Sequence, residues 1–402
     1  MTGLSARVAI VKADDFSPAA VEARTRWLIE LLGGVDSLLP PRAHKVLLKP
    51  NVVLAEEWDR TAVTTNPWVV LALARLFKEA GVEVLIGEGT SGVNSGPVFA
   101  KLGWDRLAQD AGVPLLDCKG DEGVEVSLPE GRIKKSVRVP KALLECDYRV
   151  SVAKMKTHCE TMVTFSLKNM KGIMSSDRER REMHFLDINE TLVDLNTAFK
   201  PHLAVVEGLV AMEGVGPGPT GKPFKLGVLV GGLDAVAVDA VCAGIMGFDP
   251  YEVKHIALAA ERGLGTCDLA GIEVVGARLE DVRPAGVERP PVTLDSLLPD
   301  TRVRVVKGNP CSHCSIVLAS CLSTFVPQQV SADLLRNGPP VDILVGPGAV
   351  PSDDPSRIQV AVGTCLAKYR DCLAYSPGCP PWARETTRVI VEALLQGAGA
   401  KP

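Results

Sequence analysis

Short apolar runs rich in β-branched residues alternate with stretches of helical periodicity along the first two thirds of the chain. The pattern predicts strands at residues 6–13, 45–53, 82–87 and 113–117, with helices between them at 18–32, 66–80 and 98–111. A helix that connects two successive strands brings those strands parallel in one sheet. The rhythm therefore predicts an α/β fold, with a mostly parallel sheet and helices on both faces.

The alternation of predicted strands and helices continues as far as a predicted domain boundary. It predicts strands at 147–154, 203–207, 225–230 and 272–276, helices at 234–247 and 250–263, and a β-hairpin at 124–139. Residues 285–299 are irregular and rich in proline, which is typical of a linker. We expect an α/β domain at 1–284 and a smaller, cysteine-rich α/β domain at 301–402. Its predicted elements are strands at 302–306, 341–345 and 358–362 and a helix at 383–395.

Composition narrows the classes of function. The chain has 44 basic and 48 acidic residues and a net charge of −4, so we expect no nucleic-acid partner. The N-terminus lacks a signal pattern, and no apolar run approaches the roughly 18 residues of a membrane helix, so we expect a cytoplasmic protein without a membrane partner. In a reducing compartment its 11 cysteines are expected to be buried, metal-bound or catalytic. A homo-oligomer is possible, because the sequence does not determine the oligomeric state.

The cysteines of the second domain carry the clearest chemical signal. They are Cys311, Cys314, Cys321, Cys365, Cys372 and Cys379. Thiolates in loops beside glycine and proline suit an iron–sulfur cluster or a zinc ion. We expect a [4Fe–4S] cluster on Cys311, Cys314, Cys365 and Cys379, with Cys321 or Cys372 as alternates. The alternative is zinc, held by the same four thiolates or by three of them with His313.

Polar residues follow several predicted strands of the first domain. Lys49 and Asn51 lie at the end of the second strand, Glu88 follows the third, and Glu207 ends the strand at 203–207. The carboxyl ends of parallel strands line a crevice in which ligands bind. These residues are therefore candidates for binding a substrate.

The richest polar motif is KMKTHCETMVTFSLKNMKG at residues 154–172. Its candidate residues are Lys154, Lys156, Thr157, His158, Lys168, Asn169 and Lys171. Several ammonium and hydroxyl groups on one segment would bind a carboxylate or phosphate, so we expect a small anionic substrate. Lys154, Lys156 and His158 are the candidate catalytic groups, because a desolvated lysine can act as base or nucleophile and histidine titrates near neutral pH. His184, after the charged run 177–182, is either an acid/base group or a structural histidine.

Together these motifs resemble a known family. The segments that carry the resemblance are KPNVV (49–53), TNP (65–67), GEG (87–89), the lysine motif, VVEGLVAMEGVGPGPTG (205–221) and GGLDAVAVDAVCAGIMGFDP (231–250). They are similar to the "domain of unknown function 362" family over about residues 45–275. The resemblance implies an α/β fold and an iron–sulfur segment, but no assigned reaction. Members often carry ferredoxin-like cysteine runs, whereas this chain has a single Cys-x-x-Cys with scattered partners.

The sequence therefore predicts an iron–sulfur enzyme, in the first instance a redox enzyme with an electron-transfer partner, acting on a small anionic substrate. If only three thiolates bind the cluster, an open iron favours a hydratase or lyase instead. A non-enzymatic electron-transfer protein and a zinc-stabilised anion-binding protein are the further alternatives.

Overall fold

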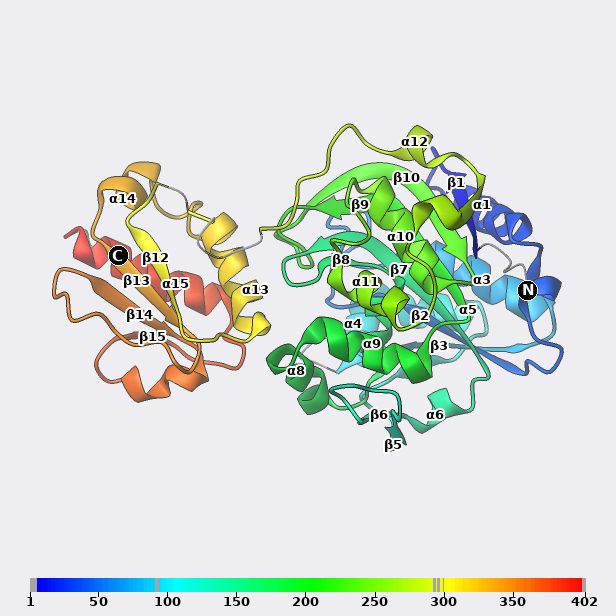
Figure 1. The fold of residues 1–402 in the computed structure, drawn as a ribbon, viewed down its shortest axis with the longest axis horizontal. Coiled ribbons are helices and arrows are strands. Elements are labelled where there is room, and N and C mark those ends of the chain that lie inside the picture. Colours follow the sequence, from blue (N-terminus) through cyan, green and yellow to red (C-terminus); the bar gives the residue numbers. More distant parts are fainter. Residues whose placement is uncertain (1–5, 91–93, 292–293, 295–296, 299, 400–402) are drawn as a thin grey trace. The chain divides into compact units, whose positions relative to one another are not determined.

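The computed structural model describes residues 6–90, 94–291, 294, 297–298 and 300–399. The chain divides into two compact units, Met1–Arg289 (unit 1) and Pro290–Pro402 (unit 2). Each unit contains its own sheet with helices packed around it (Figure 1). The predicted α/β class is therefore confirmed.

The central sheet of unit 1 is mostly parallel, as predicted. Among the described residues, its strand order is β11-β1-β10-β9-β7-β2-β3-β4, and β8 pairs with β7. The strands are β1 (Ala6–Lys12), β2 (Lys45–Pro50), β3 (Glu83–Glu88), β4 (Leu115–Asp117), β7 (Tyr148–His158), β8 (Met162–Thr164), β9 (Leu203–Glu213), β10 (Lys222–Gly232) and β11 (Ile272–Gly276). Within this set, β10 runs antiparallel to both of its neighbours, and β8 runs antiparallel to β7.

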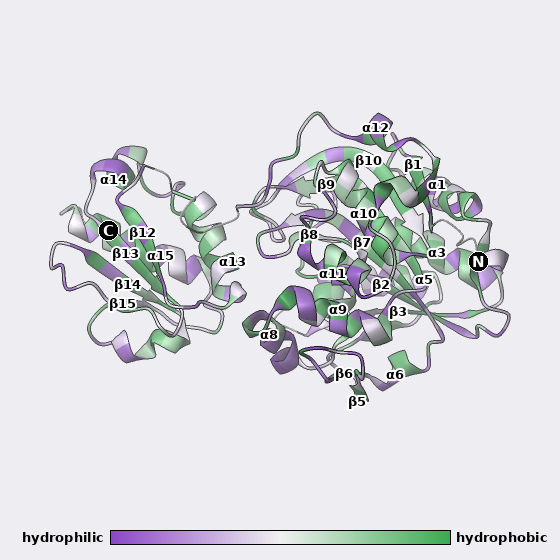
Figure 2. Cartoon of the chain, in the orientation of Figure 1, coloured by the Kyte–Doolittle hydropathy of each residue, from purple (hydrophilic) through white to green (hydrophobic). Residues whose placement is uncertain are grey.

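Helices cover both faces of this sheet, which confirms the second part of the fold prediction. Val8 and Ile10 of β1 pack in the core that contains α10 (Ala235–Ile245) and α11 (Lys254–Glu261). The alternate residues Ala9 and Val11 pack in the opposite core, which contains α1 (Pro18–Leu31) and α3 (Pro67–Glu79). Successive side chains of a strand point to opposite faces, so a sheet covered on both sides needs continuous apolar runs. Figure 2 shows hydrophobic residues concentrated in the central strands and in α10.

The remaining elements of unit 1 surround these layers. They are α2 (Val35–Leu38), α4 (Ser95–Leu102), α5 (Trp104–Asp110), β5 (Gly123–Ser127), β6 (Ser136–Pro140), α6 (Lys141–Leu144), α7 (Ser166–Asn169), η1 (Met170–Ile173), α8 (Asp177–Phe185), α9 (Ile188–Phe199), η2 (Leu269–Gly271) and α12 (Leu279–Val282). The antiparallel β5–β6 pair confirms the predicted hairpin. The single helix predicted at 98–111 is wrong, because Gly103 adopts a left-handed conformation (φ 71°) that ends α4 before α5 begins.

β7 is longer than the strand predicted at 147–154, which corrects the expectation that Lys156 and His158 lie beyond the end of the strand. The strand continues through Lys154 and Lys156 to His158. It can do so because β9 pairs with it on one side and β8 pairs antiparallel on the other, with Lys156 opposite Thr164. Lys154, Lys156 and His158 therefore occupy alternate positions of one strand.

Unit 2 has a smaller sheet whose strands follow one another in sequence order. Among the described residues, β12 (Val303–Lys307), β13 (Val341–Val345), β14 (Ile358–Val362) and β15 (Ala374–Ser376) are all parallel. The surrounding helices are α13 (Ser312–Ser320), η4 (Cys321–Phe325), α14 (Ala332–Asn337), η5 (Thr364–Tyr369) and α15 (Ala383–Gly397). The three predicted strands and the last helix are confirmed, and β15 was missed because only three residues form it.

Across the described parts of both units, no helix combines the length and the apolar character that crossing a bilayer requires.

Candidate functional site

Two lysine–carboxylate pairs are buried inside unit 1. Lys49 Nζ lies 2.9 Å from Glu88 Oε2, Lys154 Nζ lies 2.8 Å from Glu207 Oε2, and no side chain of the four is more than 3% exposed. Each carboxylate also accepts two backbone N–H bonds of 2.8–3.0 Å. The donors are Val52 and Gly89 for Glu88, and Asn66 and Leu209 for Glu207. Buried charges are stable only with such full pairing, so this geometry favours a structural role for these four predicted site residues.

Asn169, predicted to bind substrate, uses its whole amide inside the protein. Its Oδ1 accepts from Lys49 Nζ (3.1 Å) and Asn51 Nδ2 (3.2 Å), and its Nδ2 donates to the Lys49 carbonyl (2.8 Å) and Ser151 Oγ (3.0 Å). Asn51 differs, because its buried Oδ1 has no partner among the described residues. The spare acceptor makes Asn51 the member of this group that could still bind another molecule.

Lys156, Thr157 and His158 are also enclosed. Lys156 Nζ donates to the Val63 carbonyl (2.7 Å), Thr157 Oγ1 to the Gly214 carbonyl (2.9 Å), and His158 Nδ1 accepts from the Glu160 backbone (3.1 Å). Burial, reinforced by the charge of Lys168, places the pKa of both Lys156 and His158 well below their ordinary values. Lys156 and His158 therefore lie within the electrostatic reach of Lys168.

Lys168 and Lys171 are the half-buried lysines of the motif. Lys168 makes no hydrogen bond or ion pair with any residue that the structure describes, and burial lowers its pKa to about 8. The nearby side-chain oxygens of Thr164 and Ser166 are buried and lack partners in the described ranges. Polar atoms left without partners are usually satisfied by water or by a ligand, so this segment has capacity for one.

His184 connects Lys171 to a carboxylate. Its Nε2 is hydrogen-bonded to Lys171 Nζ, and its Nδ1 lies 2.9 Å from Glu160 Oε2. Arg180 lies nearby on α8 and donates to the Thr90 carbonyl (3.2 Å). We call Lys168, Lys171, Glu160, Arg180 and His184 the lysine site. Glu160 was not predicted, because it lies in the short turn between β7 and β8 and meets α8 only after the chain folds.

Gly89 and Gly172, which belong to the motifs at 87–89 and 154–172, allow the chain to pack closely beside this site. A Cβ at Gly172 would lie 2.1 Å from Glu88 Oε1 and 2.6 Å from Lys49 Nζ. A Cβ at Gly89 would lie 2.8 Å from an Arg180 guanidinium nitrogen, and the Gly89 N–H donates to the Gly172 carbonyl (2.9 Å). At both positions glycine lets the backbone and the charged side chains approach this closely, and at Gly172 the clash would be with the buried Lys49–Glu88 pair.

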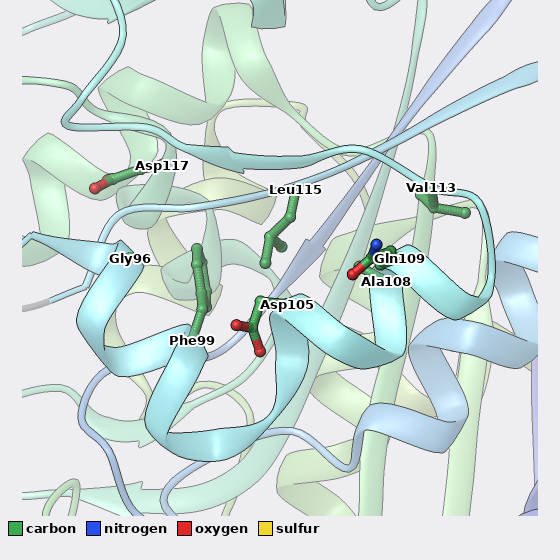
Figure 3. A pocket seen from close by; sticks show the side chains of 8 residues that line it. All are labelled: Gly96, Phe99, Asp105, Ala108, Gln109, Val113, Leu115 and Asp117. Atoms are coloured by element: carbon green, nitrogen blue, oxygen red, sulfur yellow. The ribbon is translucent and has the colours of Figure 1, made fainter.

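A separate open pocket of about 340 Å³ lies beside the edge strand β4. Its lining side chains come from α4, α5 and β4 and include Phe99, Asp105 and Asp117 (Figure 3). None of the predicted site residues lines it. Its two carboxylates also make it a poor match for the anionic substrate that the lysines predict.

In unit 2, the four predicted cluster ligands meet at one end of the sheet. Cys311 follows β12, Cys365 follows β14, Cys379 follows β15, and Cys314 lies in the first turn of α13. The hydrogen bond between Cys314 and Cys311, burial, and the neighbouring thiols of Cys365 and Cys379 raise the pKa of Cys314 far above its ordinary value. We call these four residues the cysteine edge. The carboxyl ends of parallel strands are where α/β sheets collect ligands, and this sheet gathers four thiols there.

Gly363 leaves space inside the cysteine edge. It has a positive φ of 95°, and a Cβ there would lie 3.4 Å from Cys314 Sγ and 3.7 Å from Cys365 Sγ. Two of the four thiols therefore lie beside this glycine, and the four thiols together match the donor set of an iron–sulfur cluster, whose ligands each bind a different iron. In the described residues, no three His, Cys, Asp or Glu side chains stand at the spacing of ligands to a single metal ion.

The two alternate cysteines have other surroundings. Cys321 is fully buried, and its Sγ lies 3.4 Å from the carbonyl of Ala383 at the start of α15. Cys372 is exposed, with its Sγ 3.4 Å from the Tyr369 carbonyl. Their positions favour the four primary ligands over either substitute.

The chain is similar to a curated protein, to a solved structure and to a family model. A curated relative, thylakoid-associated protein sll1697 of Synechocystis sp. (strain ATCC 27184 / PCC 6803 / Kazusa), is 28% identical over 263 residues, which cover 64% of this chain and 79% of that protein. Among solved structures, the lactate racemase apoprotein from Thermoanaerobacterium thermosaccharolyticum aligns with 98% of this chain and 91% of its own, at a TM-score of 0.42 and 10% identity. Residues 46–244 match the family model described as "Domain of unknown function (DUF362)", which confirms over that range the family resemblance predicted from the motifs.

Proposed function

We propose that the chain is an iron–sulfur redox enzyme that acts on a small anionic substrate. The cysteine edge would hold a [4Fe–4S] cluster, and the lysine site would bind the carboxylate or phosphate of the substrate. The observation that carries the proposal is the convergence of four thiols at one end of the unit 2 sheet. They belong to Cys311, Cys314, Cys365 and Cys379, and three strands lie between the first and the last of them in sequence. Ordinary core packing does not need four thiols at strand ends.

The number of thiols supports a redox role. A cubane cluster with a thiolate on each iron has no open iron for a substrate, and when bound it supplies one-electron transfer. The surroundings of Cys321 and Cys372 support the same ligand set. The thiol of each is hydrogen-bonded to a backbone carbonyl, that of Ala383 for Cys321 and that of Tyr369 for Cys372. An electron-transfer partner is part of this proposal.

The charges of the lysine site support an anionic substrate. Lys168 has no counter-charge in contact within the described structure, and Lys171 contacts an imidazole instead of a carboxylate. Glu160 and Asp177 are the carboxylates that oppose them, while Arg180, 4.0 Å from Asp177, adds a further positive charge. Partly exposed cations in excess over carboxylates form a natural binding site for carboxylate or phosphate.

The cluster is tested by anaerobic purification of the full chain, a visible spectrum, and analysis of iron, sulfide and zinc. We expect a brown protein with about four irons and four sulfides per chain. Single Cys→Ser changes at the cysteine edge should lower the iron content, whereas the matched changes Cys321→Ser and Cys372→Ser should not. Stoichiometric zinc in a colourless protein would overturn the redox proposal, and full iron binding after loss of one edge cysteine would favour an open iron.

The anion site is tested by calorimetry of the full chain with inorganic phosphate and with malonate. We expect Lys168→Met to weaken binding by at least tenfold, because it removes the half-buried ammonium that no described residue pairs. The matched control is Lys101→Met, which changes an exposed lysine of α4. Equal affinities of wild type and Lys168→Met for the bound anion would contradict this part of the proposal.

A further inference from the structure

A potential nucleophile, a proton acceptor and an orienting carboxylate lie in a row at the lysine site. Lys171 Nζ contacts His184 Nε2, and His184 Nδ1 contacts both oxygens of Glu160 at 2.9 and 3.2 Å. Because Nδ1 faces a carboxylate, the ring proton resides there and Nε2 is left as the acceptor. The order is that of a catalytic triad, in which a carboxylate orients a base and the base activates a nucleophile.

The charged groups around Lys171 favour loss of its proton. Burial lowers the pKa of Lys171 well below that of an ordinary lysine, and Lys168 and Arg180 lower it further. Glu160 and Asp177 oppose this shift more weakly. Burial, the charge of Lys171 and the same two cations lower the pKa of His184, which keeps its imidazole neutral. The largest of these charges disappears when Lys171 loses its proton, so the imidazole then becomes a better proton acceptor. An amine that is desolvated and beside other cations is the kind that attacks carbonyl carbon in enzymes.

The lysine site also limits how large the substrate can be. Lys168 and Lys171 are three residues apart in the continuous α7–η1 segment, and residues with this spacing lie side by side, about 5–6 Å apart between Cβ atoms. An anionic group held by Lys168 therefore leaves only a short gap to Lys171. A molecule whose carbonyl lies directly next to its carboxylate spans that gap.

We propose that Lys171 forms an imine with the carbonyl carbon of a small 2-oxo acid, while Lys168 and Arg180 hold its carboxylate and the His184–Glu160 pair moves the proton. This inference rests on the anion-binding part of the proposed function and names the substrate class. It does not depend on the cluster. Lys171 is the catalytic residue, and Glu160 is a positioning residue that acts through His184.

The reaction balances without an added oxidant or reductant. Lys171 passes one proton to His184 Nε2, and its nitrogen lone pair forms a bond to the carbonyl carbon as the C=O π pair moves to oxygen. The imidazolium returns the proton to that oxygen, which gives a carbinolamine. The nitrogen then loses its second proton, the hydroxyl leaves as water, and the C=N bond forms. One amine and one carbonyl give one imine and one water.

The experiment traps this imine in the full chain with glyoxylate and sodium cyanoborohydride, followed by peptide mass spectrometry across a range of pH. We expect the reduced adduct on Lys171 near neutral pH, at a rate at least tenfold above that of exposed Lys101, which is an internal reference in the same molecule. Inorganic phosphate should slow labelling of Lys171 but not of Lys101. Preferential labelling of Lys168, or equal rates for Lys171 and Lys101, would overturn the assignment.

The role of the His184–Glu160 pair is tested by the pH profile of the same labelling. Glu160→Gln removes a carboxylate that raises the pKa of Lys171, so the rise in the Lys171 labelling rate should move to lower pH, and Glu160→Asp should restore part of the wild-type profile. An unchanged profile in Glu160→Gln would remove the positioning role. Phosphate binding with no adduct on Lys171 would overturn this inference and leave the anion site standing, whereas absence of both would overturn the two together.

Discussion

Replacing Glu207 with glutamine removes a buried negative charge while keeping the shape of the side chain. In the native protein Glu207 Oε2 lies 2.8 Å from Lys154 Nζ, and both side chains are 0% exposed. The glutamine oxygen can still accept one backbone N–H, but Lys154 is left with Trp58, whose carbonyl lies 3.4 Å away and whose ring centroid lies 5.7 Å away. The substitution therefore leaves an ammonium ion in the core without a counter-charge.

The expected loss in the free energy of unfolding is about 3–5 kcal/mol, the range for removing one partner of a buried ion pair. The upper limit of this loss is the free energy needed to deprotonate Lys154. Lys154 can lose its proton instead of staying charged, and at pH 7 this costs about 4.6 kcal/mol for an unfolded-state pKa near 10.4. At pH 9 the same limit falls to about 1.9 kcal/mol.

The sign of this pH dependence is fixed by the direction of the pKa shift. Burial lowers the pKa of Lys154 in the folded chain, so the unfolded chain binds more protons between the two pKa values. The free energy of unfolding of Glu207→Gln should then rise with pH across this window, which means that the deficit relative to wild type shrinks.

Urea unfolding followed by tryptophan fluorescence measures the effect. Four of the five tryptophans lie in unit 1, and a Trp382→Phe background removes the one in unit 2. The matched control is Glu273→Gln, the same chemical change in an exposed pair with Arg7, which should leave the free energy of unfolding nearly unchanged. The reasoning is refuted if Glu207→Gln costs no more than Glu273→Gln, or if its cost is the same at pH 7 and pH 9.

Two further predictions follow from the packing of unit 1. Gly172→Ala should destabilise the chain by about 1–3 kcal/mol or more, because its Cβ would collide with Glu88 and Lys49, whereas Gly218→Ala, with no atom within 4 Å, should not. Comparable unfolding midpoints for the two variants would contradict this. Burial raises the pKa of Asp239 to about 8, above roughly 3.9 for the unfolded state, so the folded chain binds the extra proton and its free energy of unfolding falls as pH rises from about 4 to 8. Asp239→Asn should flatten that profile, and parallel profiles for wild type and variant would show that Asp239 does not titrate there.

The fold class was predictable because it depends on local patterns. The continuous apolar runs at residues 6–13 and 45–53 could pack on two sides only if helices covered both faces, which the two cores of unit 1 confirm. The break at Gly103 was not predicted, because a lone glycine inside a helical pattern is compatible with either a continued or an ended helix.

The candidate cluster ligands were recognisable one by one. Cys311-x-x-Cys314, Cys365 after a strand and Cys379 before a proline each carry a local signal. Their convergence depends on the parallel order β12-β13-β14-β15, which places the ends of three strands together. Local sequence motifs identified the candidate ligands, and the order of the strands brings these residues close together in space.

For the lysines, the sequence by itself determined the chemical type of the site but not which groups are accessible. It marked the segment 154–172 as rich in ammonium groups and hydroxyls. Only the tertiary structure decided that Lys154 is sealed against Glu207 while Lys168 stays half-buried and unpaired among the described residues, and that Glu160 meets His184 across 24 positions. The physical reason is that pairing and desolvation depend on distances between segments remote in sequence, whereas hydrophobic periodicity depends on neighbours along the chain.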